Sequence, residues 1–236
     1  MDKNKQQTIN PGLYIVSTPI GNLEDITLRA LRILKDSSLI AAEDTRQTKK
    51  LLNHYKISTP QMSYFEHNRF KRIPQIINHL NSGKDIAVVT DAGTPGISDP
   101  AYKLIRAVIE AGCRVEAIPG ASASITALSA SGLPSDRFIF EGFLPRKKGR
   151  KAKLERLSAI EATIIFFESP KRINKTLNDI LEYFGDRPAV IARELTKIHE
   201  EMIRGKVSDL LSYFTERTPR GEFVIMIGKD DPNVFF

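Results

Sequence analysis

Cysteine, tryptophan and long apolar runs are scarce or missing in this sequence of 236 residues. Its one cysteine, Cys113, excludes an internal disulfide and any cysteine-rich metal site. No apolar run approaches the roughly 18 residues that a membrane-spanning helix needs. The first ten residues are polar and lack the apolar core of a secretory signal. We therefore expect a cytoplasmic protein without membrane association, with residues 1–10 as a disordered tail.

Motifs of common cofactor sites are missing as well. The chain has no GxxxxGK[ST] segment of a P-loop and no GxGxxG after its first strand. The histidines show no metal-ligand spacing such as HExxH, so we expect no metal site. Two of them, His67 and His199, fall near the ends of expected strands and stay candidates for a functional role.

Positive charge, by contrast, is plentiful, with a net charge of +7. Such an excess favours a polyanionic partner. Six basic residues are concentrated in the segment 146–153, namely Arg146, Lys147, Lys148, Arg150, Lys151 and Lys153. A run of this kind is either a phosphate-binding patch, here for RNA, or an ordinary solvated segment, and the residues alone leave both open.

The first half of the chain alternates short apolar runs with segments of helical spacing. Five runs have the length and composition of strands, at 13–17, 39–43, 62–65, 86–89 and 113–118. Apolar residues at helical spacing follow each run. Five successive βα units predict a mostly parallel five-stranded sheet with helices on both faces.

The pattern changes after a break at 131–137. Five further strands are expected at 138–143, 163–168, 189–195, 200–205 and 222–228. The segments after residue 189 are too short for a crossover helix between every pair of strands, which predicts an antiparallel pair and a mixed sheet. We therefore expect an α/β protein with two domains, residues 11–134 and 135–236.

The segment DAGTPGISDP (91–100) is the most unusual of the chain, and it directly follows the strand expected at 86–89. Its glycines allow a ligand to approach the backbone closely. Ligands of open α/β sheets bind at the carboxyl ends of strands. Comparable loops follow other strands, at 17–22, 118–124 and 142–145. We expect these loops at a shared edge, where they form a small-molecule site whose ligand the residues do not identify.

Seven ordered segments resemble the tetrapyrrole-methylase superfamily of S-adenosylmethionine-dependent enzymes. They are GLYIVSTPIGNLEDIT (12–27), AAEDTR (41–46), VVTDAGTPGISDPA (88–101), IPGASA (118–123), FEGFLPRKKGRK (140–151), FFESPKR (166–172) and RELTKIHEE (193–201). Within the superfamily they look like the enzymes that methylate a cytidine ribose 2′-hydroxyl in the decoding region of small-subunit ribosomal RNA. The resemblance extends from about residue 12 to residue 228.

This resemblance implies a homodimer of the two-domain, class III methyltransferase fold that acts on the small ribosomal subunit. It also implies that S-adenosylmethionine binds in the cleft between the domains, held largely by backbone atoms of the loops. The residues carried over for the donor are Thr18, Pro19, Gly21, Asp91, Ala92, Gly93, Ile97, Ser98, Ala121, Ser122 and Ala123, with Phe167 and Leu195 from the second domain.

Methylation of a ribose hydroxyl needs a group that removes its proton. Our preferred catalytic cluster is Glu194, Lys197 and His199, because three polar groups gather after an apolar strand. Lys197 would be a base only if burial lowers its pKa. Asp44 and His67 are weaker candidates. The alternative is that these groups only form ion pairs that brace their loops.

Two other functions stay open from the residues. Fold alone does not separate an RNA methyltransferase from an enzyme that methylates a small tetrapyrrole-like metabolite, although the basic run 146–153 favours RNA. A non-catalytic RNA-binding assembly factor with a vestigial ligand pocket is the alternative from another class.

Overall fold

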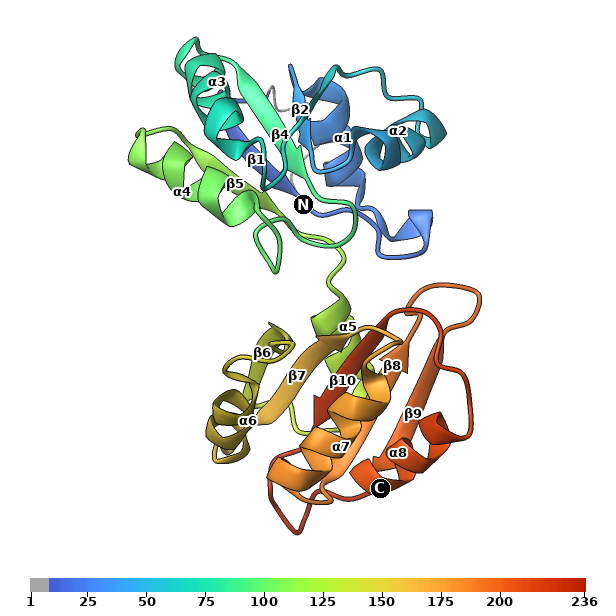
Figure 1. The fold of residues 1–236 in the computed structure, drawn as a ribbon. Helices are drawn as coiled ribbons and strands as arrows, with labels where there is room; N and C mark the ends of the chain where they lie inside the picture. Colours follow the sequence, from blue (N-terminus) through green and yellow to red (C-terminus); the bar gives the residue numbers. More distant parts are fainter. Residues whose placement is uncertain (1–8) are drawn as a thin grey trace. The chain divides into compact units, whose positions relative to one another are not determined.

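The computed structural model describes residues 9–236, so residues 1–8 of the expected disordered tail lie outside the described part. The chain divides into two compact units, Met1–Ser122 and Ala123–Phe236 (Figure 1). Residues 9 and 10 belong to the first unit. Ile9 packs against its core, and the Asn10 carbonyl accepts a hydrogen bond of 2.8 Å from the Tyr14 hydroxyl.

The first unit is built on the parallel five-stranded sheet that the sequence predicts. Its strand order is β3-β2-β4-β1-β5. The strands are β1 Gly12–Val16, β2 Ile40–Ala42, β3 Gln61–Ser63, β4 Asp85–Val89 and β5 Val115–Ile118. Strands β1 and β4 lie inside the sheet and are buried almost throughout, which explains why they read as apolar runs without alternation.

Helices cover both faces of this sheet (Figure 1). On one face, α1 (Leu28–Asp36) and α2 (Thr45–His54) form one apolar cluster with the strands. On the other face, α3 (Arg69–Asn81) and α4 (Ala101–Glu110) form a second cluster. A short 3₁₀ helix, η1 (Leu23–Asp25), follows β1. The first unit is thus a three-layer α/β fold with its own core.

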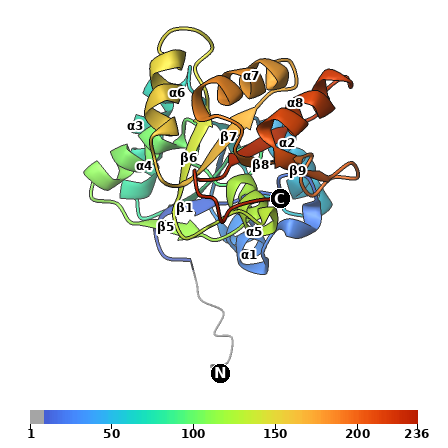
Figure 2. The ribbon, with the colours of Figure 1, turned by 90° about the horizontal axis from the view of Figure 1, so that it is seen from below.

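The second unit contains a mixed five-stranded sheet, again as predicted, in the order β6-β7-β10-β8-β9. Only β6 and β7 are parallel. The strands are β6 Phe138–Phe143, β7 Thr163–Glu168, β8 Pro188–Arg193, β9 Glu201–Lys206 and β10 Phe223–Ile227. Helices α6 (Arg150–Ser158), α7 (Ile173–Phe184) and α8 (Val207–Thr215) lie side by side on one face, as Figure 2 shows.

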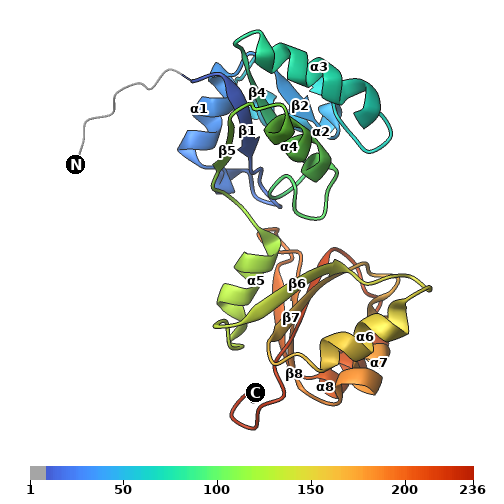
Figure 3. The ribbon, with the colours of Figure 1, turned by 90° about the vertical axis from the view of Figure 1, so that its left-hand side faces the viewer.

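Helix α5 (Ala123–Ser131) covers the opposite face of the second sheet (Figure 3). It packs on β8 and β10 and buries Ala127 and Leu128. For this reason the boundary lies after Ser122, and not between residues 134 and 135 as the sequence pattern suggested. In the part of the chain from Ile9 onward, no helix has both the length and the apolar character needed to cross a membrane.

Candidate active site

The loops after β1, β4 and β5 form one connected framework at the carboxyl edge of the first sheet. Thr18 and Gly93 exchange two backbone hydrogen bonds, of 2.9 and 3.0 Å. The Thr94 hydroxyl donates to the Ala121 carbonyl at 3.1 Å and lies 2.9 Å from the Ser17 hydroxyl. These three predicted loops are therefore in contact with one another, whereas the loop at 142–145 belongs to the second unit.

The backbone of this framework has an unusual conformation. Gly93 and Gly96 are left-handed, with φ of +83° and +90°, and Ser98 adopts φ of +63° although it is not glycine. For a residue other than glycine, here Ser98, this conformation costs about 1–3 kcal/mol, and such strain is concentrated at functional sites. A Cβ atom on Gly120 would lie 2.7 Å from that of Ser17, so the loops after β1 and β5 approach each other too closely for a side chain.

Carboxylates gather where β2 and β4 end. Asp91 Oδ1 accepts a hydrogen bond of 3.1 Å from the Asp44 N–H, and Glu43 accepts hydrogen bonds from the Thr90 hydroxyl and the Asp91 N–H. Partial burial, followed by the negative charge of Glu43, raises the pKa of Asp91. Asp44 caps α2, and its hydrogen bonds from Arg46 lower its pKa to about 2. So low a pKa makes Asp44 a weak general base.

The exposed part of the framework suits a cationic ligand better than a phosphate. The three loops, residues 17–22, 91–100 and 118–124, contain no Lys or Arg. They present the Asp91 carboxylate and the half-exposed Ile97 side chain. A carboxylate, an apolar side chain and backbone groups fit a ligand with hydroxyl, amino and sulfonium groups. The residues present therefore fit the methyl donor that the resemblance implies.

The residues predicted to hold the donor differ in exposure. Thr18 and Gly93 are buried in their mutual bridge. Those at the surface are Gly21, Asp91, Ala92, Ile97 and Ser98, and those partly buried are Pro19, Ala121, Ser122 and Ala123. Two others lie in the second unit: Phe167 packs edge-on against Phe140, and Leu195 is buried.

The second unit brings two of the three preferred catalytic residues together. Lys197 Nζ donates hydrogen bonds of 2.9 Å to Glu194 and 3.0 Å to Glu222. Burial alone would lower the pKa of Lys197, but these two carboxylates raise it above the ordinary 10.5. The condition under which Lys197 would be a base is therefore not met. The hydrogen bond from Lys197 lowers the pKa of Glu194.

Neither candidate histidine joins this cluster. His199 is exposed and forms no hydrogen bond or ion pair with the described residues. His67 belongs to the first unit, is exposed, and lies edge-on to Phe65 with 6.3 Å between the ring centroids. The third member is instead Glu222, which directly precedes β10 and which sequence reasoning missed. Within residues 9–236, no three His, Cys, Asp or Glu side chains are placed to hold a metal ion.

The turn between β8 and β9 that carries the cluster is strained. Glu194 and Thr196 have φ of +50° and +65°. The Thr196 hydroxyl oxygen is buried and has no hydrogen-bond partner among the described residues. Of the four left-handed non-glycine residues in the described chain, Ser98, Glu194 and Thr196 lie in segments predicted to be functional. This clustering is what an active site leads one to expect.

The basic segment 146–153 is not uniform. Arg150 is buried and donates hydrogen bonds to Asp179 at 2.6 Å, to the Thr176 hydroxyl and to the Pro145 carbonyl. Two of the lysines form ion pairs, Lys153 with Glu141 and Lys151 with Glu155. The three cations without an ion pair to any described residue are Arg146, Lys147 and Lys148. Arg150 is therefore structural, and these three are exposed charges that no such ion pair holds.

The chain is similar to known proteins over most of its length. The family described as Tetrapyrrole (Corrin/Porphyrin) Methylases matches residues 12–211. A Thermotoga maritima protein named Ribosomal RNA small subunit methyltransferase I is 52% identical over 92% of the chain and 99% of its own length. A protein of the same name from Halalkalibacterium halodurans is also 52% identical, over 91% of the chain and 75% of its own length.

Solved structures share the fold at much lower identity. Cobalt precorrin-4 methyltransferase superposes with a TM-score of 0.69 at 20% identity, covering 92% of this chain and 94% of that one. Uroporphyrin-III C-methyltransferase from Thermus thermophilus, solved as a complex with S-adenyl homocysteine, superposes with a TM-score of 0.64 at 17% identity, covering 91% and 96%.

Proposed function

The chain belongs to the tetrapyrrole (corrin/porphyrin) methylase family, and from this membership we propose that it is an S-adenosylmethionine-dependent methyltransferase of small-subunit ribosomal RNA. The observation that carries the proposal is the 52% identity, over more than nine-tenths of the chain, to proteins with that activity in their name. The tetrapyrrole enzymes are 20% identical or less and share only the fold, so they support the metabolite alternative less well.

In this proposal the three loops of the first unit hold the donor. The bound donor would supply a methyl group activated by its sulfonium sulfur, and the leaving group would be the neutral thioether. The exposed Asp91 carboxylate accepts hydrogen bonds from the ligand, and the left-handed backbone at Gly93 and Gly96 allows it close approach. The main task of these rigidly connected loops is alignment, which can contribute roughly 7–11 kcal/mol to lowering the barrier.

For the acceptor we propose the ribose 2′-hydroxyl of a cytidine in the decoding region. This hydroxyl is a weak nucleophile, and proton removal by a positioned base contributes about 10²–10⁴-fold. Glu194 is ionised and serves as the proton acceptor. Lys197 is protonated and stabilises the negative charge that develops on the oxygen. Because Lys197 also makes Glu194 less basic, the cluster acts chiefly through electrostatics. A catalytic role for His199 or His67 stays a prediction.

We also propose that the protein works in the cytoplasm, where ribosomal subunits are its partner, and that it is a homodimer. The family resemblance supports the dimer, and exposed apolar side chains such as Phe70 and Ile198 are suited to an interface. Light scattering should give about twice the 26.5 kDa mass of the chain. A mass of one chain at micromolar concentration would contradict it.

Methyl transfer from labelled donor to unmodified small ribosomal subunits tests the function. Label in ribosomal RNA, mapped by nuclease digestion to a cytidine 2′-oxygen, supports the proposal. Asp91→Asn should weaken donor binding, whereas Asp36→Asn, exposed at the end of α1, should not. Donor binding without any RNA methylation points to the assembly factor, and label in a tetrapyrrole alone points to the metabolite enzyme.

A further inference from the structure

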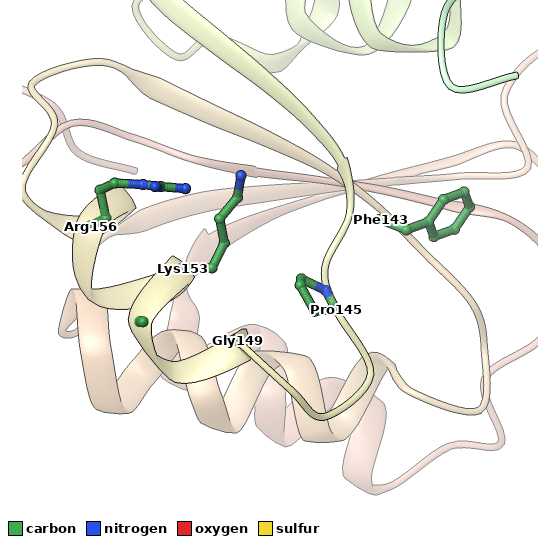
Figure 4. Close-up of a pocket in the computed structure, with 6 residues that line it drawn as sticks. Phe143, Pro145, Gly149, Lys153 and Arg156 are labelled. Carbon is green, nitrogen blue, oxygen red and sulfur yellow. The ribbon is translucent and has the colours of Figure 1, made fainter.

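A pocket of about 250 Å³ lies in the second unit, between the end of β6 and α6 (Figure 4). The residues that line it are Phe143, Pro145, Gly149, Ala152, Lys153 and Arg156. Phe143 lies in the loop at 142–145 that the sequence analysis grouped with the donor loops, but neither Phe143 nor Arg156 is among the predicted donor-binding or catalytic residues. The pocket therefore places an aromatic ring and a further cation beside the exposed charges of the basic segment.

A β-bulge shapes one wall of the pocket. The pairing of β6 with β7 shifts between Phe140 and Gly142, and Gly142 has φ of +65°. Bulges redirect side chains and are frequent next to functional sites. Directly after the bulge, Phe143 is 58% exposed, and its ring lies edge-on to Phe167 at 5.8 Å. So large an exposed apolar ring, held by a second ring, is free to stack with a ligand.

Hydrogen bonds from two arginine side chains fix the segment that follows the bulge. Arg172 donates a hydrogen bond to the Leu144 carbonyl at 3.2 Å, and Arg150 donates to the Pro145 carbonyl at 3.1 Å. Arg172 in turn donates at 2.7 Å to Glu168, whose side chain is fully buried. The wall of the pocket is therefore preorganised, which lowers the entropy cost of binding a ligand.

The charge inside the pocket is positive. Lys153 and Arg156 both extend from α6, and Figure 4 shows them side by side, with Phe143 on the far side of Pro145. Lys153 forms an ion pair with Glu141, whereas Arg156 has none among the described residues. The cation and the ring thus lie at two separate places of one pocket, which suits a ligand that carries an anionic group and a separate aromatic group.

We propose that this pocket binds one nucleotide of single-stranded RNA that flanks the methylated one, with its phosphate on Arg156 and its base on the exposed ring of Phe143. The proposal rests on the proposed function, because an RNA substrate is what supplies such a nucleotide. Aromatic rings stack with any base, so the pocket contributes affinity and position more than choice of sequence. Arginine is suited to phosphate through its planar set of donors.

The test measures binding of a fluorescein-labelled oligoribonucleotide with the decoding-region sequence, over a range of salt concentrations. Arg156→Gln should make the slope of log affinity against log salt about 0.7 less steep, as expected for one lost phosphate contact to a single strand. Phe143→Leu should weaken binding about 5- to 100-fold at every salt concentration and leave the slope unchanged. Phe143→Tyr, which keeps the ring, should bind like the wild type.

Two substitutions outside the pocket are matched controls. Lys175→Gln removes an exposed charge from α7, and Phe138→Leu removes a partly exposed ring from the other end of β6. Lys175→Gln should leave the salt slope of RNA binding unchanged, and Phe138→Leu should leave the affinity unchanged. Unfolding curves and calorimetry with S-adenosylhomocysteine show that each variant is folded and still binds the demethylated donor.

The outcomes separate this proposal from the proposed function. If the wild type methylates ribosomal RNA while Phe143→Leu and Arg156→Gln bind RNA as tightly as it does, the pocket proposal fails and the function stands. If only Arg156→Gln has an effect, the site is a simple phosphate contact and the nucleotide pocket is again wrong. If the wild type neither binds nor methylates RNA, the proposed function itself fails.

Discussion

At the scale of residues, Gly221 and Glu194 share a space that holds only one side chain. Gly221 has φ of +95°, and a Cβ atom there would lie 2.5 Å from Glu194 Cγ. The absence of a side chain at Gly221 is thus what lets Glu194 turn towards Lys197. In this way a residue without chemistry of its own determines the geometry of the candidate catalytic cluster.

We expect Gly221→Ala to destabilise the protein by more than about 1 kcal/mol and to lower the rate of methyl transfer, because Glu194 has to move. Gly83→Ala is the matched control, since Gly83 is also left-handed, at φ of +78°, but has open space around it. The control should cost stability through backbone strain alone and leave the rate unchanged. Urea unfolding and single-turnover kinetics measure both effects, and equal rates for the two variants would contradict the role of Gly221.

The ion pair of Glu194 and Lys197 predicts a pH dependence of stability. The pKa of Glu194 is lowered in the folded state from its ordinary 4.5. Its contribution is therefore fully present above pH 4.5 and is lost as the pH falls through the lowered pKa. Urea unfolding between pH 7 and pH 3 should show a stability advantage of the wild type over Glu194→Gln that disappears at the acid end. An advantage that stays constant over this range would count against the pair.

Single residues also show where sequence reasoning stops. Glu194 and Lys197 could be named in advance because polar groups after an apolar strand stand out. Their partner Glu222 is 25 residues away from Lys197 in the chain and acquires its role only through the pairing of β8 with β10. Likewise, the left-handed conformation of Glu194 and Thr196 has no sequence signal, because neither is among the residues that commonly adopt it.

At the scale of elements, the strands could be predicted and two helices could not. Each strand end lies within two residues of its predicted position, because the buried strands are plain apolar runs. The sequence pattern predicts no helix at α6, because cations are so frequent there that the helical spacing of Leu154 and Leu157 does not stand out. Both leucines pack in the core of the second unit. Helix α8 lies in the connection from β9 to β10, and the sequence pattern, whose segments after residue 189 are too short for a crossover helix between every pair of strands, predicts no helix there.

The basic segment 146–153 supplies a prediction about the start of α6. Arg150 ties the start of α6 to Asp179 and Thr176 of α7. Arg150→Met should lower the free energy of unfolding by about 1–3 kcal/mol, because the partly buried Asp179 carboxylate and the Pro145 carbonyl lose a charged hydrogen-bond donor. Lys148→Met, two residues earlier and exposed, should change it by less than about 0.5 kcal/mol. Urea unfolding compares the two, and similar small effects would show that Arg150 is not structural.

At the scale of the whole molecule, the sequence motifs and the order of strands and helices predict the family and the fold class, but not the domain boundary. The resemblance that the ordered motifs carry extends over nearly the whole chain, and the family they indicate is confirmed by the family match and the relatives. The fold class, which the alternation of strands and helices predicts, is confirmed as well. The domain boundary did not follow, because α5 continues the βα rhythm of the first unit although it packs on the second sheet.

The position of α5 leads to a prediction about fragments. The apolar clusters of the two units share no residue, so each unit has a core of its own. We therefore expect residues 123–236 to fold and unfold cooperatively as a separate fragment. A fragment that begins at residue 135 lacks α5 with its buried Leu128, and the face of β8 and β10 that α5 covers becomes exposed to water.

Burial of a leucine side chain alone is worth about 1.5–3 kcal/mol, and Arg204 adds hydrogen bonds from β9 to the last carbonyls of α5. The shorter fragment should therefore be less stable in urea by at least about 2 kcal/mol. It should also bind a dye specific for exposed apolar surface, which the longer one should not. If the two fragments unfold at the same urea concentration, α5 does not belong to the second unit, and the boundary returns to the stretch near residue 134 that the sequence pattern indicated.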